Sequence, residues 1–249
     1  MCSKTASIFL LSLGPALVLA QGKRGLAYNN GTLANLFSGQ SQVTWGYNWG
    51  FDRIGLDNSL DFSPMLWGLP SSANPDWTAA VDAAGVKEIL GFNEPDLGSQ
   101  SNISPSDAAA GYLEFMQPFE DQVRIGTPAV TNGPPPSMGV GWMDQFFGNC
   151  TSCTLDFVAI HWYSNNDPDG FKSHVQQFYK YNKPIWITEF AASGSEDDQI
   201  SFLQNVLPWL DSQAQVERYA YFGVFPGFLA NENGDGMSQL GQVYATYSG

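Results

Sequence analysis

Two glutamates in this sequence each end a short run of residues that is typical of a buried β-strand. Glu94 lies in the hexapeptide Gly-Phe-Asn-Glu-Pro-Asp, and Pro95 stops further strand pairing because it has no N–H to donate. Glu189 ends the segment Ile-Trp-Ile-Thr-Glu, which is rich in β-branched and aromatic residues. Two carboxyl groups that face one pocket can break a glycosidic bond, one as proton donor and the other as nucleophile. The pair predicts this chemistry, provided that the fold brings the two strand ends together.

Eight strand-like segments, most of them followed by a helical stretch, supply the elements that position the pair. Strands are expected at residues 25–28, 43–47, 64–67, 88–93, 123–127, 157–163, 185–190 and 219–224. Helical stretches are expected at residues 33–37, 76–84, 104–119, 142–147, 171–181, 198–210 and 238–247. This alternation predicts a single α/β domain, a (β/α)₈ TIM barrel of minimal size. Such barrels carry their chemistry at the carboxyl ends of the strands, so Glu94 on the fourth strand and Glu189 on the seventh should meet at the barrel mouth.

The period of two along a strand predicts which side chains share a face. On the seventh strand, Ile185 and Ile187 should lie on the same face as Glu189. Asn93 and Glu94 are adjacent and would point to opposite faces of a regular strand, so a β-bulge is expected there. On the sixth strand the expected inward row is Ala159, His161 and Tyr163, with Val158, Ile160 and Trp162 facing the helices.

The first residues have the composition of a targeting signal rather than of a folded element. Lys4 precedes an apolar stretch over residues 8–19, and the Val-Leu-Ala that ends at Ala20 suits signal peptidase. Residues 1–20 are therefore expected to be a signal peptide, and the protein to be secreted into the extracellular medium or the cell wall. The Lys23–Arg24 pair offers a second, dibasic cleavage site, so the barrel domain is expected to span residues 25–249. No apolar tail ends the chain, and no lipid anchor is expected.

Charge and composition narrow the class of partner. The formal net charge is −14, which argues against nucleic acid or an anionic membrane as a partner. Aromatic residues make up 14% of the chain, and their rings can stack on sugar rings as well as fill a core. A neutral carbohydrate is therefore the expected partner, and a monomer the expected state. No spacing of acidic or glycine residues fits a calcium site or a phosphate loop, so no metal or cofactor is expected.

Cys150 and Cys153 remain once Cys2 leaves with the signal peptide. Their spacing, Cys-Thr-Ser-Cys, could make a redox-active pair or half of a zinc site, but the chain holds no second cysteine pair. In a secreted protein a short structural disulfide is the expected outcome. Glycosylation sequons begin at Asn30, Asn102 and Asn149.

Polar and aromatic residues near the expected strand ends complete the candidate site. Asn93 has the donors and the acceptor to bind a sugar hydroxyl, although it could instead stabilise its own loop. Tyr163 could donate to Glu189, and His161 could do the same or be a core histidine. Five aromatic residues could stack on sugar rings, namely Trp45, Tyr47, Trp49, Trp67 and Trp162. Some of the five must instead belong to the core. Asp52 and Asp96 are expected to be solvated loop residues.

Three motifs taken together resemble glycoside hydrolase family 128, a family of clan A that includes fungal cell wall proteins. They are Gly91-Phe92-Asn93-Glu94-Pro95-Asp96, His161-Trp162-Tyr163 and Trp186-Ile187-Thr188-Glu189-Phe190. The resemblance covers nearly the whole chain after the signal peptide and implies a retaining β-1,3-glucanase on a (β/α)₈ barrel without metal. It implies Glu189 as the nucleophile and Glu94 as the acid that keeps its proton for the leaving oxygen. The chain departs from many clan A enzymes near the end of strand eight, where it has Tyr-Phe-Gly-Val-Phe at residues 221–225 in place of their tryptophan.

The sequence thus predicts a secreted endo-β-1,3-glucanase whose partner is a β-1,3-glucan polysaccharide or oligosaccharide. Two alternatives stay open. One is a carbohydrate-binding cell wall protein on the same barrel with little turnover. The other is a clan A enzyme that acts on a different β-glycan, such as a xylan or a mannan, or that acts from the chain end.

Overall fold

The structure, a computed structural model, describes residues 22–249, so the expected signal peptide lies outside the described residues. The strands are β1 (Arg24–Tyr28), β2 (Val43–Tyr47), β3 (Asp61–Phe62), β4 (Glu88–Ile89), β5 (Arg124–Ile125), β6 (Val158–Ser164), β7 (Ile185–Ala192) and β8 (Val216–Val224). The α-helices are α1 (Gly31–Ala34), α2 (Pro75–Val81), α3 (Pro105–Phe115), α4 (Gly139–Asn149), α5 (Pro168–Gln177), α6 (Glu196–Ser212) and α7 (Gln239–Thr246). Short 3₁₀ helices are η1 (Asn35–Phe37), η2 (Gln117–Phe119) and η3 (Phe178–Tyr181). Within residues 22–249, no helix is both long and apolar enough to cross a bilayer.

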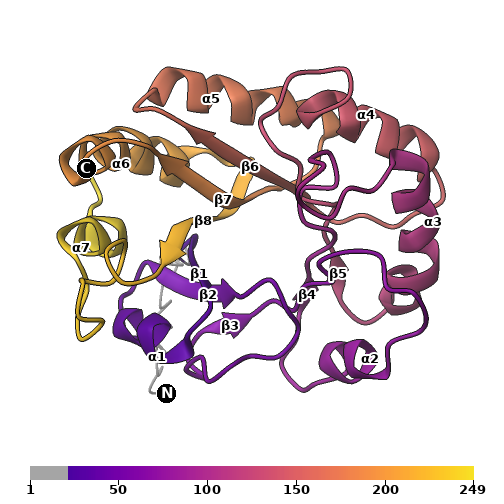
Figure 1. Ribbon diagram of the computed structural model, residues 1–249, viewed down its shortest axis with the longest axis horizontal. Coiled ribbons are helices and arrows are strands. Elements are labelled where there is room, and N and C mark those ends of the chain that lie inside the picture. Colours follow the sequence, from indigo (N-terminus) through magenta and orange to yellow (C-terminus); the bar gives the residue numbers. More distant parts are fainter. Residues whose placement is uncertain (1–21) are drawn as a thin grey trace, which may run out of the picture.

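The parallel strands follow one another around a ring, and the helices surround them (Figure 1). Six strands form one sheet in the order β3-β2-β1-β8-β7-β6, and β4 pairs with β5. Single bridges join these two parts, from Met65 to Leu90 on one side and from Gly126 to Phe157 on the other. The ring is therefore the predicted (β/α)₈ barrel. The third strand begins earlier than residues 64–67, at Asp61, and Met65 only extends it by a bridge.

The barrel interior holds one cluster of buried side chains. Almost every strand or strand extension contributes to it: Ala27, Trp45, Tyr47, Met65, Leu90, Phe157, Trp186 and Ala220. Gly25 makes room for this cluster, since a Cβ there would lie 2.2 Å from the Trp45 ring. Next to the cluster, the Arg218 guanidinium stacks 4.5 Å from the Trp186 ring centroid and lies 3.4 Å from Glu88 Oε1. Charges therefore close the amino-terminal end, and the mouth is left for chemistry.

A larger apolar layer packs between the strands and the helices, as expected for a barrel. Val158, Ile160 and Trp162 of β6 all point into it, which confirms the predicted outward face of that strand. Helix α3 begins with the predicted cap, because the Ser104 hydroxyl accepts a hydrogen bond from the Asp107 N–H and Pro105 takes the first helical position.

The Lys23–Arg24 pair, which the sequence offered as a second cleavage site, makes contacts within the folded barrel. Arg24 is fully buried; its Nη2 lies 3.0 Å from Asp211 Oδ2, and its Nη1 donates to the Tyr244 carbonyl at 2.6 Å. Lys23 Nζ donates to the carbonyls of Leu210, Asp211 and Gln213 at the end of α6. Strand β1 begins at Arg24, one residue before the expected start of the domain.

Cys150 and Cys153 form the predicted disulfide directly after α4. The bridge precedes β6, which begins at Val158, so it lies at the amino-terminal end of the strands. It is therefore remote from the barrel mouth.

Candidate active site

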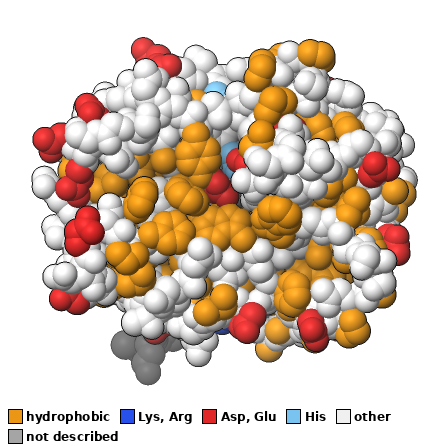
Figure 2. Space-filling model, viewed as in Figure 1, with side chains coloured by type: hydrophobic (Ala, Val, Ile, Leu, Met, Phe, Trp, Pro, Cys, Tyr) orange, Lys and Arg blue, Asp and Glu red, His pale blue; other side chains and the backbone are white. Residues whose placement is uncertain are grey.

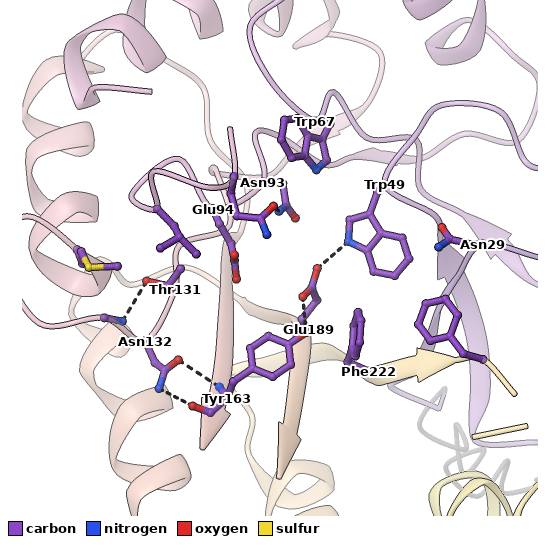
Figure 3. Close-up of a pocket in the computed structure, with 15 residues that line it drawn as sticks. Asn29, Trp49, Trp67, Asn93, Glu94, Thr131, Asn132, Tyr163, Glu189 and Phe222 are labelled. Atoms are coloured by element: carbon purple, nitrogen blue, oxygen red, sulfur yellow. Dashed lines mark hydrogen bonds between the residues drawn. The ribbon is translucent and has the colours of Figure 1, made fainter. Parts of the chain in front are cut away.

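Glu94 and Asn93 reach the mouth through an unusual backbone conformation at the end of the fourth strand. Glu94 has a φ of 42°, in the left-handed region that side chains with a Cβ seldom adopt. Its N–H donates to the Ala129 carbonyl at 2.8 Å, and the Asn93 N–H donates to the Trp67 carbonyl at 2.8 Å. The left-handed residue turns both adjacent side chains toward one cavity (Figure 3), where a β-bulge had been expected.

Glu189 points into the barrel because β7 contains one extra residue. Ile160 pairs with Ile187, but the next residue on β6, His161, pairs with Glu189, so Thr188 is bulged. Ile185 and Ile187 lie in the outer apolar layer, which corrects the prediction that they share a face with Glu189. Without the bulge, alternation would send Glu189 outward among the helices.

Three donors hold the Glu189 carboxylate. The Trp49 indole N–H donates to Oε1 at 2.7 Å and the Tyr163 hydroxyl to Oε2 at 2.5 Å. The Tyr47 hydroxyl shares its one proton between the Thr188 carbonyl at 2.9 Å and Glu189 Oε1 at 3.2 Å. Burial and the negative charge of Glu189 raise the pKa of Tyr47 and of Tyr163, so both phenols stay protonated as donors. Figure 3 shows Trp49 and Tyr163 on opposite sides of the carboxylate. This arrangement fixes the orientation of the Glu189 carboxylate.

His161 lies between the two glutamates but bonds to Glu94. Its Nδ1 lies 2.8 Å from Glu94 Oε1 and 3.6 Å from Glu189 Oε2, and its Nε2 lies 3.0 Å from Thr188 Oγ1. Burial alone would lower the pKa of His161, but the charges of Glu189 and Glu94 outweigh it and raise that pKa. The sequence left open that His161 donates to Glu189, but the carboxyl group within hydrogen-bond distance of His161 is that of Glu94.

The separation of the two carboxyl groups decides between two kinds of hydrolysis. Glu94, His161 and Glu189 each present one ligand atom within 4.8 Å of the others. Carboxyl groups about 5 Å apart belong to enzymes that retain the anomeric configuration, whereas inverting enzymes hold theirs roughly 6.5–9.5 Å apart.

The same three side chains are spaced closely enough to hold a metal ion. The donors from Trp49 and Tyr163, however, already point at the lone pairs of Glu189 that a cation would need. The donor set therefore fits a carboxylate nucleophile better than a metal ligand.

The two glutamates open into a cavity of about 710 Å³ at the barrel mouth. It is lined by Asn29, Trp49, Trp67, Asn93, Glu94, Leu97, Gln100, Thr131, Asn132, Gly133, Met138, Tyr163, Glu189, Phe222 and Phe225. The Trp49 ring stacks 6.3 Å from Phe225 and meets Phe222 edge-on at 5.8 Å, so one wall is aromatic. Figure 2 shows a band of hydrophobic side chains across this face, with acidic and histidine atoms visible in the hollow at its centre. Aromatic walls around polar groups are suited to a sugar ring.

Asn93 presents an unused acceptor to this cavity. The side chain is 4% exposed, its Nδ2 donates to Gln100 Oε1 at 3.2 Å, and its Oδ1 has no hydrogen-bond partner among the described residues. A buried acceptor without a partner is costly, so a donor from a ligand is the natural complement.

The predicted aromatic residues divide into three groups. Trp49 and Trp67 line the cavity. Tyr47 is fully buried, and its hydroxyl contacts the Glu189 carboxylate and the Thr188 carbonyl. Trp45 packs inside the barrel and Trp162 against Phe202 outside it, so neither can stack on a ligand and the prediction is wrong for both.

Residue types alone did not point to several residues of the cavity. Phe222 and Phe225 belong to the segment that replaces the tryptophan of many clan A enzymes, and that departure was their only signal in the sequence. Asp96 was expected to be solvated, but its carboxylate accepts hydrogen bonds from the Thr131 N–H and hydroxyl and from the Gly139 N–H. Asp52 is exposed, as expected.

A (β/α)₈ barrel with two such carboxyl groups at the ends of strands four and seven is the architecture of two-carboxylate glycoside hydrolases. The profile of the family described as "Glycosyl hydrolase catalytic core" matches residues 25–244. The chain therefore belongs to this family, and within it to glycoside hydrolase family 128.

Relatives of known structure share the fold over their whole length. A subgroup III curdlan-specific exo-β-1,3-glucanase of the family from Blastomyces gilchristii, solved with glucose, is 44% identical with a TM-score of 0.84. The match covers 91% of this chain and 99% of that one. A subgroup II endo-β-1,3-glucanase from Sorangium cellulosum is 28% identical with a TM-score of 0.79, covering 90% and 98% of the two chains.

A curated relative, alkali-sensitive linkage protein 1 of Schizosaccharomyces pombe, is 31% identical over 245 residues. The match covers 90% of this chain but only 44% of that protein, so the chain spans less than half of its length.

Proposed function

We propose that this protein is a retaining β-1,3-glucanase in which Glu189 is the nucleophile and Glu94 is the general acid and base. The observation that carries the proposal is the unequal environment of two carboxyl groups within 4.8 Å. Glu189 accepts hydrogen bonds from Trp49 and Tyr163, with the Tyr47 hydroxyl 3.2 Å from the same carboxylate, and these donors hold it in one orientation. Among the described residues, the Glu94 carboxyl group forms a hydrogen bond only through Oε1, with His161, which leaves Oε2 for the proton that the reaction requires.

The reaction follows from these positions. A Glu189 oxygen attacks the anomeric carbon, the glycosidic C–O bond breaks, and the proton of Glu94 passes to the leaving oxygen. Glu94, now ionised, takes a proton from water, whose oxygen attacks the same carbon and releases Glu189. Asn93 Oδ1, which has no hydrogen-bond partner within residues 22–249, accepts a hydrogen bond from a hydroxyl of the sugar beside the broken bond.

The substrate is inferred from relatives and from the surface of the site. Relatives solved at 44% and 28% identity are named as β-1,3-glucanases, and one from Amycolatopsis mediterranei was solved with laminarihexaose. The cavity offers rings for stacking and neutral amides rather than cationic groups. A linear β-1,3-glucan therefore fits, and we infer that it is met outside the cell, which the Cys150–Cys153 disulfide supports.

The mode of action has two candidates. The cavity shares Tyr163 and Phe222 with a second hollow and Trp67 with a third, and a groove that continues on both sides favours internal cleavage. Cleavage from the chain end is favoured by the 44% identical relative, which is named an exo enzyme specific for curdlan.

One assay tests activity, substrate and mode together. Curdlan, laminarin, xylan and mannan are incubated with the wild type and with Glu94→Gln and Glu189→Gln, and products are separated by size. Reducing sugar from the two β-1,3-glucans alone, lost in both variants, supports the proposal. Early release of a ladder of oligosaccharides indicates internal cleavage, and glucose alone indicates cleavage from the end. Glucan binding without turnover by the wild type would instead identify a carbohydrate-binding wall protein.

A further inference from the structure

Within residues 22–249, no strand neighbours the main chain around Tyr163 on one side of β6. On the other side, Tyr163 pairs with Ala191 of β7. Toward β5, main-chain pairing consists of single bridges from Gly126 to Phe157 and from Val130 to Ile160, and β5 itself ends at Ile125. The residue that donates to the nucleophile is therefore at an open edge of the barrel.

The Asn132 side chain takes the place of the missing strand. Its Nδ2 donates to the Tyr163 carbonyl at 3.0 Å, and its Oδ1 accepts from the Tyr163 N–H at 3.1 Å (Figure 3). Only an amide supplies a donor and an acceptor with this geometry from one side chain. The Tyr163 ring is 38% exposed and meets Phe222 edge-on at 5.7 Å, so packing alone restrains it little.

Asn132 is in turn anchored from the strand that carries the other glutamate. Its neighbour Thr131 donates to the Asp96 carboxylate through both its N–H and its hydroxyl, at 3.1 and 2.7 Å. Gly139 donates to the same carboxylate at 2.7 Å, at the far end of the loop. Asp96 lies two residues after Glu94, so one chain of contacts connects the end of β4 to the end of β6.

We propose that Asn132 is a positioning residue for the nucleophile, which acts by clamping the Tyr163 main chain so that the Tyr163 hydroxyl stays on Glu189. Asp96 supports the clamp by fixing the loop that carries Asn132. The inference rests on the proposed function and adds a residue that makes no bond to either glutamate. Since Asn132 also lines the cavity, its test must separate positioning from direct contact with the sugar.

The test measures how fast the glycosyl-enzyme forms. A 2,4-dinitrophenyl 2-deoxy-2-fluoro-β-laminaribioside needs no proton from Glu94 and traps the intermediate, so its inactivation rate reports the attack by Glu189 alone. Asn132→Ala should lower this rate roughly 10- to 100-fold, as expected when a reacting group is displaced by about an ångström. Asn132→Asp keeps the acceptor but loses the donor, so its inactivation rate should lie between the rates of the wild type and of Asn132→Ala. Asn205→Ala, which removes an exposed amide on α6, serves as a matched control and should not change the rate.

A double-mutant cycle with Tyr163→Phe decides the mechanism. If Asn132 acts through the Tyr163 hydroxyl, Asn132→Ala should change the rate less than about twofold once that hydroxyl is absent. An equal loss in both backgrounds would show contact with the sugar instead, and an unchanged rate in the wild-type background would also overturn the proposal. Should Asn132→Ala fail to fold, Asn132→Asp replaces it in the same double-mutant cycle with Tyr163→Phe. Failure of the probe to label Glu189 in the wild type, seen by peptide mass, would count against the proposed function rather than against the clamp.

Discussion

Glu94 and Glu189 have different partners, and this difference predicts how their alanine variants should fail. Glu189→Ala leaves an empty space beside the anomeric carbon, where azide can attack directly and give the α-azide from a β-linked substrate. Glu94→Ala still forms the intermediate from a substrate with a good leaving group, and azide then opens it to the β-azide. Product configuration by NMR checks both outcomes.

Full activity in either variant would remove that residue from the site. Exchanged azide configurations would keep the site but reverse the two roles. The opposite stereochemistry of the two products makes each variant the control for the other.

His174 predicts how the stability of the fold depends on pH. Its Nε2 donates to the His161 carbonyl, and burial lowers the pKa of His174 to about 4, from an ordinary value near 6.5. Below pH 6.5 the unfolded chain binds a proton that the folded chain excludes, so this residue costs stability as the pH falls from about 6.5 to about 4. The loss is on the order of 3 kcal/mol.

His174→Gln keeps a donor for the His161 carbonyl but cannot titrate. The free energy of unfolding, measured with urea at both ends of this pH range, should fall less in the variant than in the wild type. Equal losses in the two proteins would contradict the assignment.

At the scale of elements, Arg24 ties the first strand to the last helices. Its guanidinium is fully buried and bonds to Asp211, to the Tyr219 hydroxyl and to carbonyls at the end of α7. Arg24→Met removes the charge from a buried pair and should lower the free energy of unfolding by about 3–5 kcal/mol. Lys180→Met, which breaks an exposed pair with Asp144, should cost less than about 1 kcal/mol in the same denaturant titration. Similar losses of unfolding free energy in the two variants would show that Arg24 does not tie the first strand to the last helices.

The disulfide should affect stability without affecting activity. Cys150 and Cys153 close a loop of only a few residues, so their covalent bond restricts the unfolded chain by about 2 kcal/mol. The loop lies at the end of the barrel opposite to the glutamates. The double variant with alanine at both positions should unfold earlier while hydrolysing glucan at the wild-type rate. A large loss of turnover at a temperature where the variant is folded would contradict this separation.

The whole molecule carries 24 acidic and 10 basic residues, which predicts how salt acts on it. The negative electrostatic field of the protein does not change the binding free energy of a neutral glucan, so KM for laminarin should not depend on ionic strength. A carboxymethylated glucan is repelled, and its KM should fall as salt rises from about 0.01 M to about 0.15 M, where the Debye length shrinks from roughly 30 Å to about 8 Å. Initial rates across this range check the prediction. A KM for the anionic polymer that rises with salt would mean that local cationic groups dominate its binding.

The sequence by itself determined the features that depend on neighbours along the chain. The alternation of strands and helices predicted the barrel, and the strand ends at Glu94 and Glu189 predicted where the two carboxyl groups would lie. The Ser104–Pro105 helix start and the Cys150–Cys153 bridge were likewise predicted correctly. In each case the physical cause is local: backbone propensity, a missing N–H, or a short covalent loop.

Tertiary structure alone decided which way side chains point and what they contact. The bulge at Thr188 turns Glu189 into the barrel, and it exists only because β6 and β7 pair in a shifted register. Trp162 is buried because a helix covers it, and Arg24 because the end of the chain packs over it. Asn132 bonds to the Tyr163 main chain, which lies 31 residues further along the sequence. No pattern of neighbouring residues could reveal this contact. Register and long-range contacts are properties of the assembled barrel, since a shift of one residue in a strand exchanges its inner and outer faces.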